Sequence, residues 1–418
     1  MEAQRMRTVI YALSILIQLF VLFIGLYHCV IGVFAFIERK KKTDIPDKKN
    51  TFALVVAAHN EHSVIKQMVQ SLNNLDYDRD SYDIYVIADN CTDDTAAIAA
   101  EAGALVHERF NTEKRGKGYA LEWMFEKIFK MDKQYDAICI FDADNIVDPQ
   151  YLNEINIKLN EGYKAVQGYI DTKNPNDSWI TASYAISFWC LNKLFQTARS
   201  NLGLSNQING TGFALRTEIL KEIGWGATCL TEDMEFTMKL ILNNIKVGWA
   251  KKAVVYDEKP LTLSQSFKQR TRWMQGHTDV ASRFIKPLAK KWLRDNDWAA
   301  FDGMIYLLQP MLLIAMLITT TMSIIQIFYP TEDIWFIPNL ALPSAVWNII
   351  MLVELAFFPF VLWLEKKLTF KMLLFYIPYI AFTYTWMPIA VVGVAKRNQK
   401  EWFHTQHTRK ISIEELES

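Results

Sequence analysis

The sequence predicts an α/β domain with a mostly parallel, doubly wound sheet, combined with an α-helical membrane region. Strand-like and helix-like segments alternate between residues 51 and 145, and such alternation builds a parallel sheet with helices on both faces. Long segments with few charged residues flank this region and predict membrane helices. The chain has 418 residues, which is enough for about two or three domains.

The composition excludes several classes of protein. The 45 basic and 45 acidic side chains give a net charge of zero, which argues against a nucleic-acid-binding protein. The five cysteines include no Cys-x-x-Cys pair, so we expect neither a disulfide scaffold nor a zinc ribbon. The charges are also unevenly spread, and this distribution says more than the sum.

Two regions of the chain are almost free of charge. Residues 9–37 contain no acidic or basic side chain, and residues 303–395 contain seven. A membrane-spanning helix needs about 20 apolar residues, and segments 303–329, 334–364 and 372–395 all exceed that length. A signal peptide is the alternative for the first segment, but its apolar run is too long and no small-residue cleavage site follows.

The basic residues predict the orientation in the membrane. Two arginines precede the first segment and six basic residues follow it, between positions 39 and 49, which places the soluble domain in the cytoplasm. Three full C-terminal spans would then leave the basic tail outside, against the same rule. Because Pro378 and Pro388 interrupt the last segment, we expect part of it to take a re-entrant or interfacial course.

The elements of the soluble domain follow one another in a regular order. Short apolar runs predict strands, and amphipathic stretches between them predict helices. We expect strands at 51–58, 83–89, 104–108 and 136–145, and helices at 63–72, 92–103 and 118–131. Thr92 is the expected N-cap of the second helix, and Gly103 is expected at its C-terminal end.

Three of these strands end in polar residues. Asn60 and Glu61 follow the first strand, Asp89 ends the second, and Asp142 and Asp144 end the fourth. Parallel sheets bind ligands at the carboxyl ends of their strands. A loop tip is polar in most proteins, but three such tips on neighbouring strands favour a binding site.

Two features of this edge point to a diphosphate and a cation. The pair Asp142-x-Asp144 could hold Mg²⁺ or Mn²⁺, because one or two carboxylates suffice when substrate phosphates provide the other oxygens; a solvated strand end is the alternative. Lys117 lies in a short glycine-containing segment before a helix, where backbone N–H groups suit a diphosphate. Neither a dinucleotide-binding glycine motif nor a P-loop is present.

Two further motifs lie downstream of these acids. Glu232 and Asp233 open a predicted helix after Thr231; they could serve the helix dipole alone, or one could be the general base that takes a proton from an acceptor hydroxyl. The second motif consists of Gln269, Arg272 and Trp273, which lie further downstream.

The segment that carries this last motif has two compatible roles. Residues 264–298 are rich in aromatic and basic side chains, which predicts an amphipathic helix at the membrane surface. Such a helix can also present Arg272 to a diphosphate and Trp273 to the face of a sugar.

In this order, the motifs resemble those of the processive inverting glycosyltransferases of family 2, which include cellulose, hyaluronan, chitin-oligosaccharide and poly-N-acetylglucosamine synthases. The resemblance runs from Thr51 to Gly276 and extends more weakly to the tail. It implies a GT-A fold, a UDP-sugar donor, Mg²⁺ or Mn²⁺, and a cytoplasmic catalytic domain in a multi-pass protein of the cell membrane. His59 departs from the pattern, because an aromatic residue that stacks on the base is common there.

The resemblance also implies a role for each matching residue. The donor would contact the three strand tips, Lys117, Arg272 and the tail, that is Ala57, Asn60, Glu61, Asp89, Lys117, Asp142, Asp144, Arg272, Trp402, Thr405 and Arg409. The metal would bind Asp142 and Asp144, and Asp233 would be the base, with Glu232 beside it. The acceptor would contact Gly210, Thr211, Gln269 and Trp273. The tail residues resemble a gating segment, which requires a cytoplasmic tail.

The sequence therefore divides into five parts: a membrane helix at 1–42, a GT-A domain at 43–260, interfacial helices at 261–300, membrane helices at 301–395 and a tail with a possible gating segment at 396–418. The expected function is the synthesis and secretion of a β-linked polysaccharide from a UDP-sugar, with a growing glycan as acceptor and the lipid bilayer as partner. A β-glucan from UDP-glucose is preferred to a product of UDP-N-acetylglucosamine. The alternatives are the transfer of one sugar to a membrane lipid, and a transport or signalling protein with a degenerate transferase domain.

Overall fold

The computed structural model describes residues 2–37, 48–227, 229–328, 344–399, 409–411, 413 and 415. Its centre is an eight-stranded sheet in the order β3-β2-β1-β4-β7-β6-β8-β5. The strands are β1 (Phe52–Ala58), β2 (Tyr82–Asp89), β3 (Leu105–Arg109), β4 (Ala137–Asp142), β5 (Ile146–Val147), β6 (Ala165–Thr172), β7 (Phe213–Arg216) and β8 (Val247–Asp257). β1 to β4 pair in parallel, β6 pairs with β8 in parallel, and β5 and β7 run antiparallel to their neighbours.

Helices cover both faces of this sheet, because successive residues of its strands point to opposite sides. Phe52 and Leu54 of β1 belong to a core closed by α2 (Ile65–Asn73), α3 (Thr95–Glu101) and α5 (Tyr151–Asn160). Ala53 and Val55 belong to a second core closed by α4 (Lys117–Ile128), α8 (Thr217–Ile223) and α9 (Glu232–Leu242). The doubly wound sheet expected from the sequence is confirmed.

Two of the element boundaries that differ from the sequence expectations have a clear local cause. The fourth strand ends at Asp142 instead of 145, because the chain turns there and forms β5 four residues later, at Ile146. Thr92 is not the N-cap of α3; the helix begins after Asp94, and the Asp93 carboxylate accepts the backbone N–H of Thr95 at 3.1 Å. Gly103 is not the C-cap either; the helix ends at Glu101 with Ala102 as its C-cap, and Gly103 follows with a positive φ of 101°.

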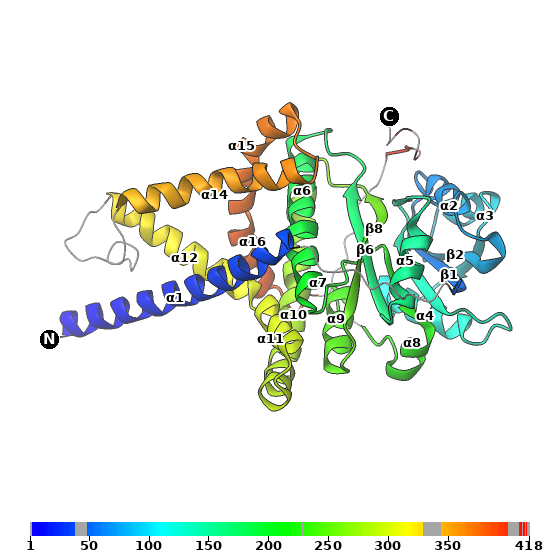
Figure 1. The fold of residues 1–418 in the computed structure, drawn as a ribbon, viewed down its shortest axis with the longest axis horizontal. Helices are drawn as coiled ribbons and strands as arrows, with labels where there is room; N and C mark the ends of the chain where they lie inside the picture. The colour runs from blue at the N-terminus through cyan, green and yellow to red at the C-terminus, as the bar shows by residue number, and fades with distance from the viewer. Residues whose placement is uncertain are drawn as a thin grey trace.

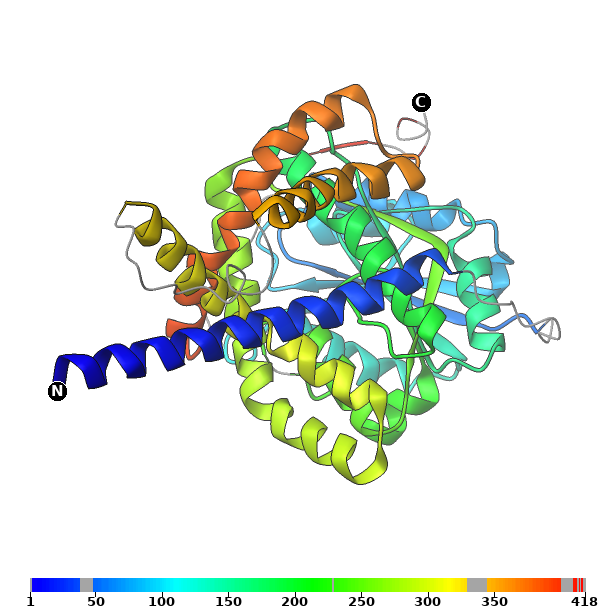
Figure 2. The ribbon, with the colours of Figure 1, turned by 60° about the vertical axis from the view of Figure 1, so that its left-hand side comes forward.

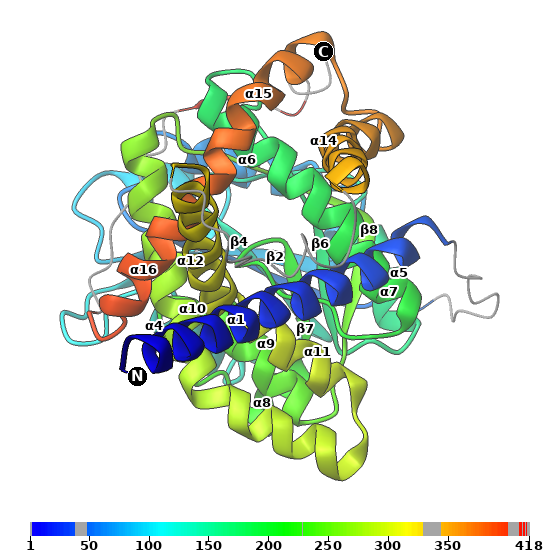
Figure 3. The same cartoon turned by 90° about the vertical axis from the view of Figure 1, so that its left-hand side faces the viewer.

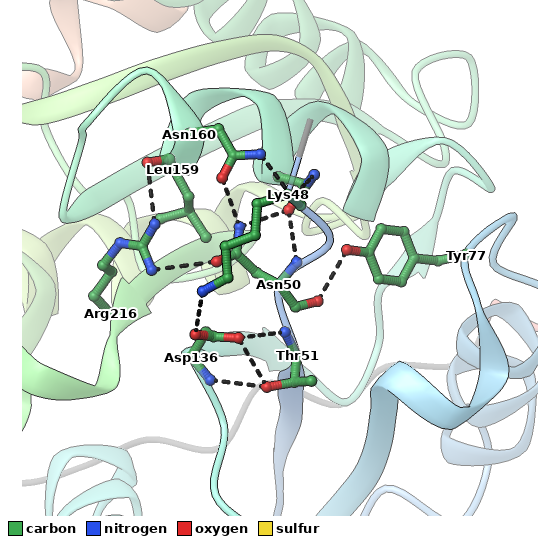
Figure 4. A network of polar contacts seen from close by, with 9 residues as sticks. Lys48, Asn50, Thr51, Tyr77, Asp136, Leu159, Asn160 and Arg216 are labelled. Carbon is green, nitrogen blue, oxygen red and sulfur yellow. Dashed lines mark hydrogen bonds and ion pairs between the residues drawn. The ribbon is translucent and has the colours of Figure 1, made fainter. Parts of the chain in front are cut away.

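A polar network fixes the edge of the sheet that is opposite the strand tips (Figure 4). The Asp136 carboxylate accepts the backbone N–H of Thr51 at 2.9 Å and an ion pair from Lys48 at 2.9 Å. The Asn50 carbonyl accepts the Tyr77 hydroxyl, and Arg216 donates to the Asn50 side chain. These bonds anchor the starts of β1 and β4, so that their carboxyl ends are held in register.

The segment between β6 and β7 is helical and apolar. It comprises α6 (Trp179–Cys190), a π-helical segment, η3 (Leu191–Thr197), and α7 (Ala198–Leu202). α6 packs against the last helices of the chain in a third core that includes Tyr184 and Trp189. Two single-turn 3-10 helices, η1 (Phe34–Phe36) and η2 (Arg79–Ser81), complete the short elements.

Three helices project from the sheet domain toward one side (Figure 1): α1 (Glu2–Val33), α12 (Gln309–Phe328) and α14 (Ser344–Leu364). α1 is one continuous helix that extends beyond the rest of the molecule (Figure 2). The 33-residue α10 (Leu263–Asp295) and the shorter α11 (Trp298–Leu307) lie at the base of this group. Seen from the side of the projecting helices, the sheet lies behind α6 and α1 (Figure 3).

By length and composition, three helical segments among the described residues could cross a membrane: Gln4–Phe36, Gln309–Gln326 and Phe370–Ala395. α14 has 21 residues and contains a shorter apolar segment, Leu355–Leu364. The structure thus contains helices of membrane-spanning length on both sides of the sheet domain in the chain, as the charge distribution predicts.

The last of these segments follows a different course from α1, α12 and α14. It consists of α15 (Phe370–Tyr384) and α16 (Trp386–Ala395), which meet at Thr385 and run beside α6 and α10 (Figure 1). Near its start, Lys371 donates to the Asn176 carbonyl at 3.1 Å. Just past its end, the Lys396 carbonyl accepts from the Gln275 side chain of α10 at 3.2 Å. Both ends therefore contact the sheet domain or its attached helix.

The loop between α14 and α15 is also tied to the sheet domain by charge. Lys367 pairs with the buried Asp171 of β6 at 2.7 Å. Glu365 pairs with Lys193 at 3.2 Å and with Lys251 at 2.9 Å. These contacts place the loop on the same side as the sheet.

Candidate active site

The three polar strand tips lie side by side. β1 pairs in parallel with β2 on one side and with β4 on the other, so the carboxyl ends of all three meet at one edge of the sheet. In this register Ala57 is opposite Asp142. The expected cluster of Asn60, Asp89 and the Asp142 segment is thus assembled by the sheet itself.

At the first two tips, the side chains are fixed by polar contacts. The Asp89 carboxylate is buried and pairs with Arg109 at the end of β3. The Asn60 side chain accepts the backbone N–H of Thr92 at 2.8 Å, and Asn60 adopts a positive φ of 55°. The backbone N–H of Glu61 donates to a threonine hydroxyl of α3 at 2.8 Å. The two tips therefore form one preorganised surface, which suits the nucleoside expected there.

Lys117 is the hub of the site. Its ammonium group contacts the Asp142 carboxylate and donates to the Gly210 carbonyl at 2.7 Å. Burial alone would lower the pKa of Lys117, but the carboxylates of Asp142, Glu232 and Asp233 raise it. A positive charge held at the start of α4 suits a diphosphate.

Asp144 is held more tightly than Asp142. It is 3% exposed, and one of its carboxylate oxygens accepts the backbone N–H of Glu258 at 3.1 Å. Directly after Asp144, the Asn145 side-chain oxygen accepts the Thr211 hydroxyl. Thr211 thereby connects the acidic turn to the expected acceptor loop.

The two acids fit a divalent cation only if the substrate supplies most of its ligands. Among the residues that the structure describes, no three His, Cys, Asp or Glu side chains are arranged to hold a metal ion. Asp142 remains 38% exposed and can therefore face a bound diphosphate. Mg²⁺ and Mn²⁺ accept one or two carboxylates together with phosphate oxygens and water, so the donor set fits such an ion in the presence of a diphosphate.

Glu232 and Asp233 are the first two residues of α9, and Thr231 occupies its N-cap position without a side-chain cap bond. Burial, and then the neighbouring Glu232 carboxylate, raise the pKa of Asp233 to about 7, although Lys117 and Arg272 oppose the rise. A carboxylate with a pKa near the working pH is a good general base. A methyl group placed on Gly210 would lie 3.5 Å from an Asp233 carboxylate oxygen, so the expected acceptor loop lies against the expected base.

α10 lies directly on the start of α9. A methyl group placed on Gly276 would lie 2.5 Å from the Thr231 hydroxyl oxygen, which shows how closely the two backbones approach. Arg272 is near enough to lower the pKa of both acids. Trp273 is half-buried, and the Gln269 side-chain oxygen is buried without a partner among the described residues. Of the three residues of this motif, Arg272 thus interacts with both acids across the contact between α10 and α9.

Two buried amides hold the acceptor loop, and nothing in the sequence distinguishes them. The Gln167 side chain of β6 accepts the backbone N–H of Asn209 at 2.9 Å and donates to the Thr211 carbonyl at 3.0 Å. The Gln196 side chain donates to the Gln207 carbonyl at 2.9 Å. Gln167 is a lone amide in an apolar part of β6, and Gln196 lies in a helical segment of mixed polarity, so only the fold identifies their partners.

The tail contacts the site beside the carboxyl end of β6, at the same edge of the sheet as the strand tips. Lys173, which is buried, donates to the Asp144 carbonyl at 2.7 Å and to the Arg409 carbonyl at 3.3 Å. The Arg409 guanidinium pairs with Asp177, and a cavity of about 560 Å³ lies beside this pair. The structure thus places Arg409 next to the second acid of the turn, whereas Trp402 and Thr405 lie outside the described residues.

Comparison with known sequences identifies related proteins. The model of the family described as "Glycosyltransferase like family 2" matches residues 49–276. The chain is 28% identical over 247 residues to the probable glycosyltransferase YdaM of Bacillus subtilis, covering 57% of this chain and 58% of that protein. It is 28% identical to the β-monoglucosyldiacylglycerol synthase of a Nostoc species (54% and 48% covered) and 27% identical to the poly-β-1,6-N-acetyl-D-glucosamine synthase of Staphylococcus aureus (62% and 64%). The matches thus span about half to two thirds of these relatives.

A solved structure shares nearly the whole fold. The mannosyltransferase PcManGT from Pyrobaculum calidifontis, in complex with GDP-Man and Mn²⁺, superposes with a TM-score of 0.62. The superposition covers 93% of this chain and 99% of that one, at 15% sequence identity. This similarity shows that the GT-A sheet and its attached apolar helices form a known arrangement.

Proposed function

Because the chain belongs to glycosyltransferase family 2, we propose that it transfers a hexose from a UDP-sugar, with inversion, to a hydroxyl group presented at the cytoplasmic membrane surface. The observation that carries this proposal is the position of Asp233. A carboxylate with a pKa raised to about 7 lies against the Gly210 loop, close to the ammonium group that contacts Asp142. The site thus supports a base on one side and a diphosphate on the other.

In the proposed reaction, Asp233 accepts the proton of the acceptor hydroxyl while that oxygen bonds to the anomeric carbon of the donor. The bond between this carbon and the diphosphate oxygen breaks in the same displacement, so an α-linked donor gives a β-linked product. Lys117 and Arg272 are placed to hold the departing diphosphate. A Mg²⁺ or Mn²⁺ ion on Asp142 and Asp144 would supply further positive charge to that group.

Our first candidate for the acceptor is a growing β-linked glycan, extended processively. Two indoles, those of Trp273 and Trp386, are stacked 6.3 Å apart at 18° next to the motif that reaches the base. Flat aromatic faces suit sugar rings, and the poly-N-acetylglucosamine synthase is among the relatives. A glucan from UDP-glucose remains our preferred product, with UDP-N-acetylglucosamine as the alternative donor.

The second candidate acceptor is a membrane lipid that receives one sugar. It is favoured by the exposed apolar side chains of α15, among them Phe370 and Ile377, which are 77% and 71% exposed. The relatives also include a glucosyldiacylglycerol synthase. In this case the elbow of α15 and α16 would border the lipid-facing entrance of the site.

We further propose that α1, α12 and α14 cross the bilayer, whereas α15 and α16 lie along its cytoplasmic surface. The contacts at both ends of the α15–α16 pair support this course, because a spanning helix would carry one end about 30 Å away. The tail then returns to the cytoplasm, as its contact with the Asp144 turn requires.

The test is to incubate the purified protein with a panel of UDP-sugars and Mg²⁺ or Mn²⁺, and to follow UDP release and product. A polymer that a linkage-specific glycanase degrades would support the processive candidate. A product that partitions with lipid and carries one sugar would establish the second candidate. If none of the UDP-sugars released UDP, even with native membranes added as a source of acceptor, the proposed activity would be contradicted.

A further inference from the structure

Resting on the proposed function, we infer that Arg270 is a positioning residue for glycosyl transfer: it locks the α15–α16 elbow onto α10 and thereby fixes the Trp273–Trp386 wall relative to the base. Arg270 lies between Gln269 and Arg272 but has a different environment from both. Its side chain is fully buried, with 0% exposure. It therefore acts on the reaction only through its neighbours.

The guanidinium group of Arg270 has no carboxylate partner among the described residues. Its Nη1 donates to the Thr385 hydroxyl at 2.7 Å, and its Nη2 is buried without a partner. The group lies over the rings of Phe382 and Trp386, at 4.1 and 5.1 Å from their centroids. A buried charge without a counter-ion is costly, and cation–π contacts offset only part of that cost. Stability of the fold therefore does not account for an arginine at this position.

Three of its contacts belong to the elbow, and its Nε also donates to the Ser266 carbonyl of α10 at 3.4 Å. Thr385 is the residue at which α15 ends and α16 begins, and its hydroxyl donates to the Phe382 carbonyl at 2.6 Å. Because that proton is committed, the remaining lone pairs of the oxygen face Arg270. Arg270 therefore contacts residues on both sides of the bend, Phe382 of α15 and Trp386 of α16.

The elbow is linked to the base through α10. Trp386, just after the bend, stacks on Trp273, whose other neighbour is Tyr184 at 6.1 Å. Further along, a methyl group placed on Gly393 of α16 would lie 2.4 Å from the Met274 side chain. Two residues later, Gly276 closes on Thr231. α16 therefore packs on α10, and α10 packs on the start of α9. A shift of the elbow would then move Trp273 relative to Asp233.

The test compares R270M and T385V with wild type in detergent or nanodiscs, using the UDP-sugar that wild type consumes. We expect R270M to lower kcat for transfer at least tenfold while the KM for the UDP-sugar and the melting temperature stay within error, because the variant removes a buried charge without a counter-ion. The fraction of donor lost to hydrolysis should rise, since the donor side is intact and the acceptor is misplaced. T385V should show the same pattern, and the double variant should be no worse than R270M.

A matched control is R294M, which removes an exposed arginine from the end of the same helix and should behave as wild type. The inference is overturned if R270M retains wild-type kcat, if its loss of activity parallels a loss of melting temperature, or if T385V and R270M combine additively. Failure of the proposed function is distinguishable, because wild type itself would then show no transfer, and the inference concerns only the ratio of variant to wild type.

Discussion

Asp233 illustrates how a residue acquires its chemistry from its surroundings. It opens a helix, where the dipole favours a charged carboxylate, yet burial and the adjacent Glu232 favour the neutral form and prevail. The sequence predicts an acid at this point, and the structure explains why its pKa reaches about 7.

The D233N variant should separate catalysis from stability. We expect transfer to fall by about 10²- to 10⁴-fold, the usual contribution of a general base. Because the pKa of Asp233 is raised in the folded state, the folded protein loses stability as the pH rises from about 4 through 7. D233N removes that loss and should melt at a higher temperature than wild type at pH 8. Differential scanning fluorimetry and UDP release measure both effects.

The control is D132N, an exposed acid far from the strand tips, which should change neither quantity. In wild type, kcat/KM should rise with pH through the neutral range as Asp233 loses its proton. A D233N variant with full activity, or a lower melting temperature than wild type at pH 8, would contradict the assignment.

At the scale of elements, α10 is the helix whose packing partners the sequence does not predict. Its amphipathic pattern predicts a helix at the membrane surface, and the structure contains one helix from Leu263 to Asp295. The motif residues on it were predicted, but the close contacts of Gly276 and Met274 with two different helices were not. Helix packing depends on side chains far apart in the chain, so a local pattern identifies the buried face without its partners.

His277 on the same helix gives a prediction about stability. The residue is 1% exposed, and its ring contacts the Tyr306 carbonyl of α11 at 3.1 Å. Burial lowers the pKa of His277 to about 4 from 6.5. The unfolded chain therefore binds a proton first, and stability falls as the pH drops from 6.5 toward 4, by up to about 3 kcal/mol at 1.36 kcal/mol for each pKa unit.

The measurement is chemical unfolding of wild type and H277Q between pH 4 and 8. The difference between the two proteins should shrink as the pH falls, because only wild type carries the protonation penalty at this site. A pH-independent difference would show that His277 does not titrate in this range.

At the scale of the whole molecule, the open matter is which helices cross the bilayer. Counting apolar segments gives one topology, and the contacts of the α15–α16 pair give another. The second agrees with the basic residues of the tail and with the charged loop that is tied to β6.

Single cysteines at Lys366 and Arg397 test this topology, in a background without Cys29, Cys91 and Cys229. Both positions are exposed and flank the α15–α16 pair. We expect both to react with a membrane-impermeant maleimide only from the cytoplasmic side, whereas Q4C, at the far end of α1, should react only from outside. Labelling of K366C and R397C from opposite sides would show that the pair spans the membrane.

Sequence patterns alone predict the alternating sheet domain, its position between apolar segments, and the acids at the three strand tips. These follow from local patterns: strand and helix periods, and motifs whose spacing is fixed by one turn or one strand end. The contacts of individual side chains are visible only in the folded chain. Examples are Arg109 with Asp89, Gln167 with the expected acceptor loop, and Arg270 with the elbow. The reason is physical: a polar side chain is satisfied by whichever group the fold brings within about 3 Å, and that group can be any distance away in the chain.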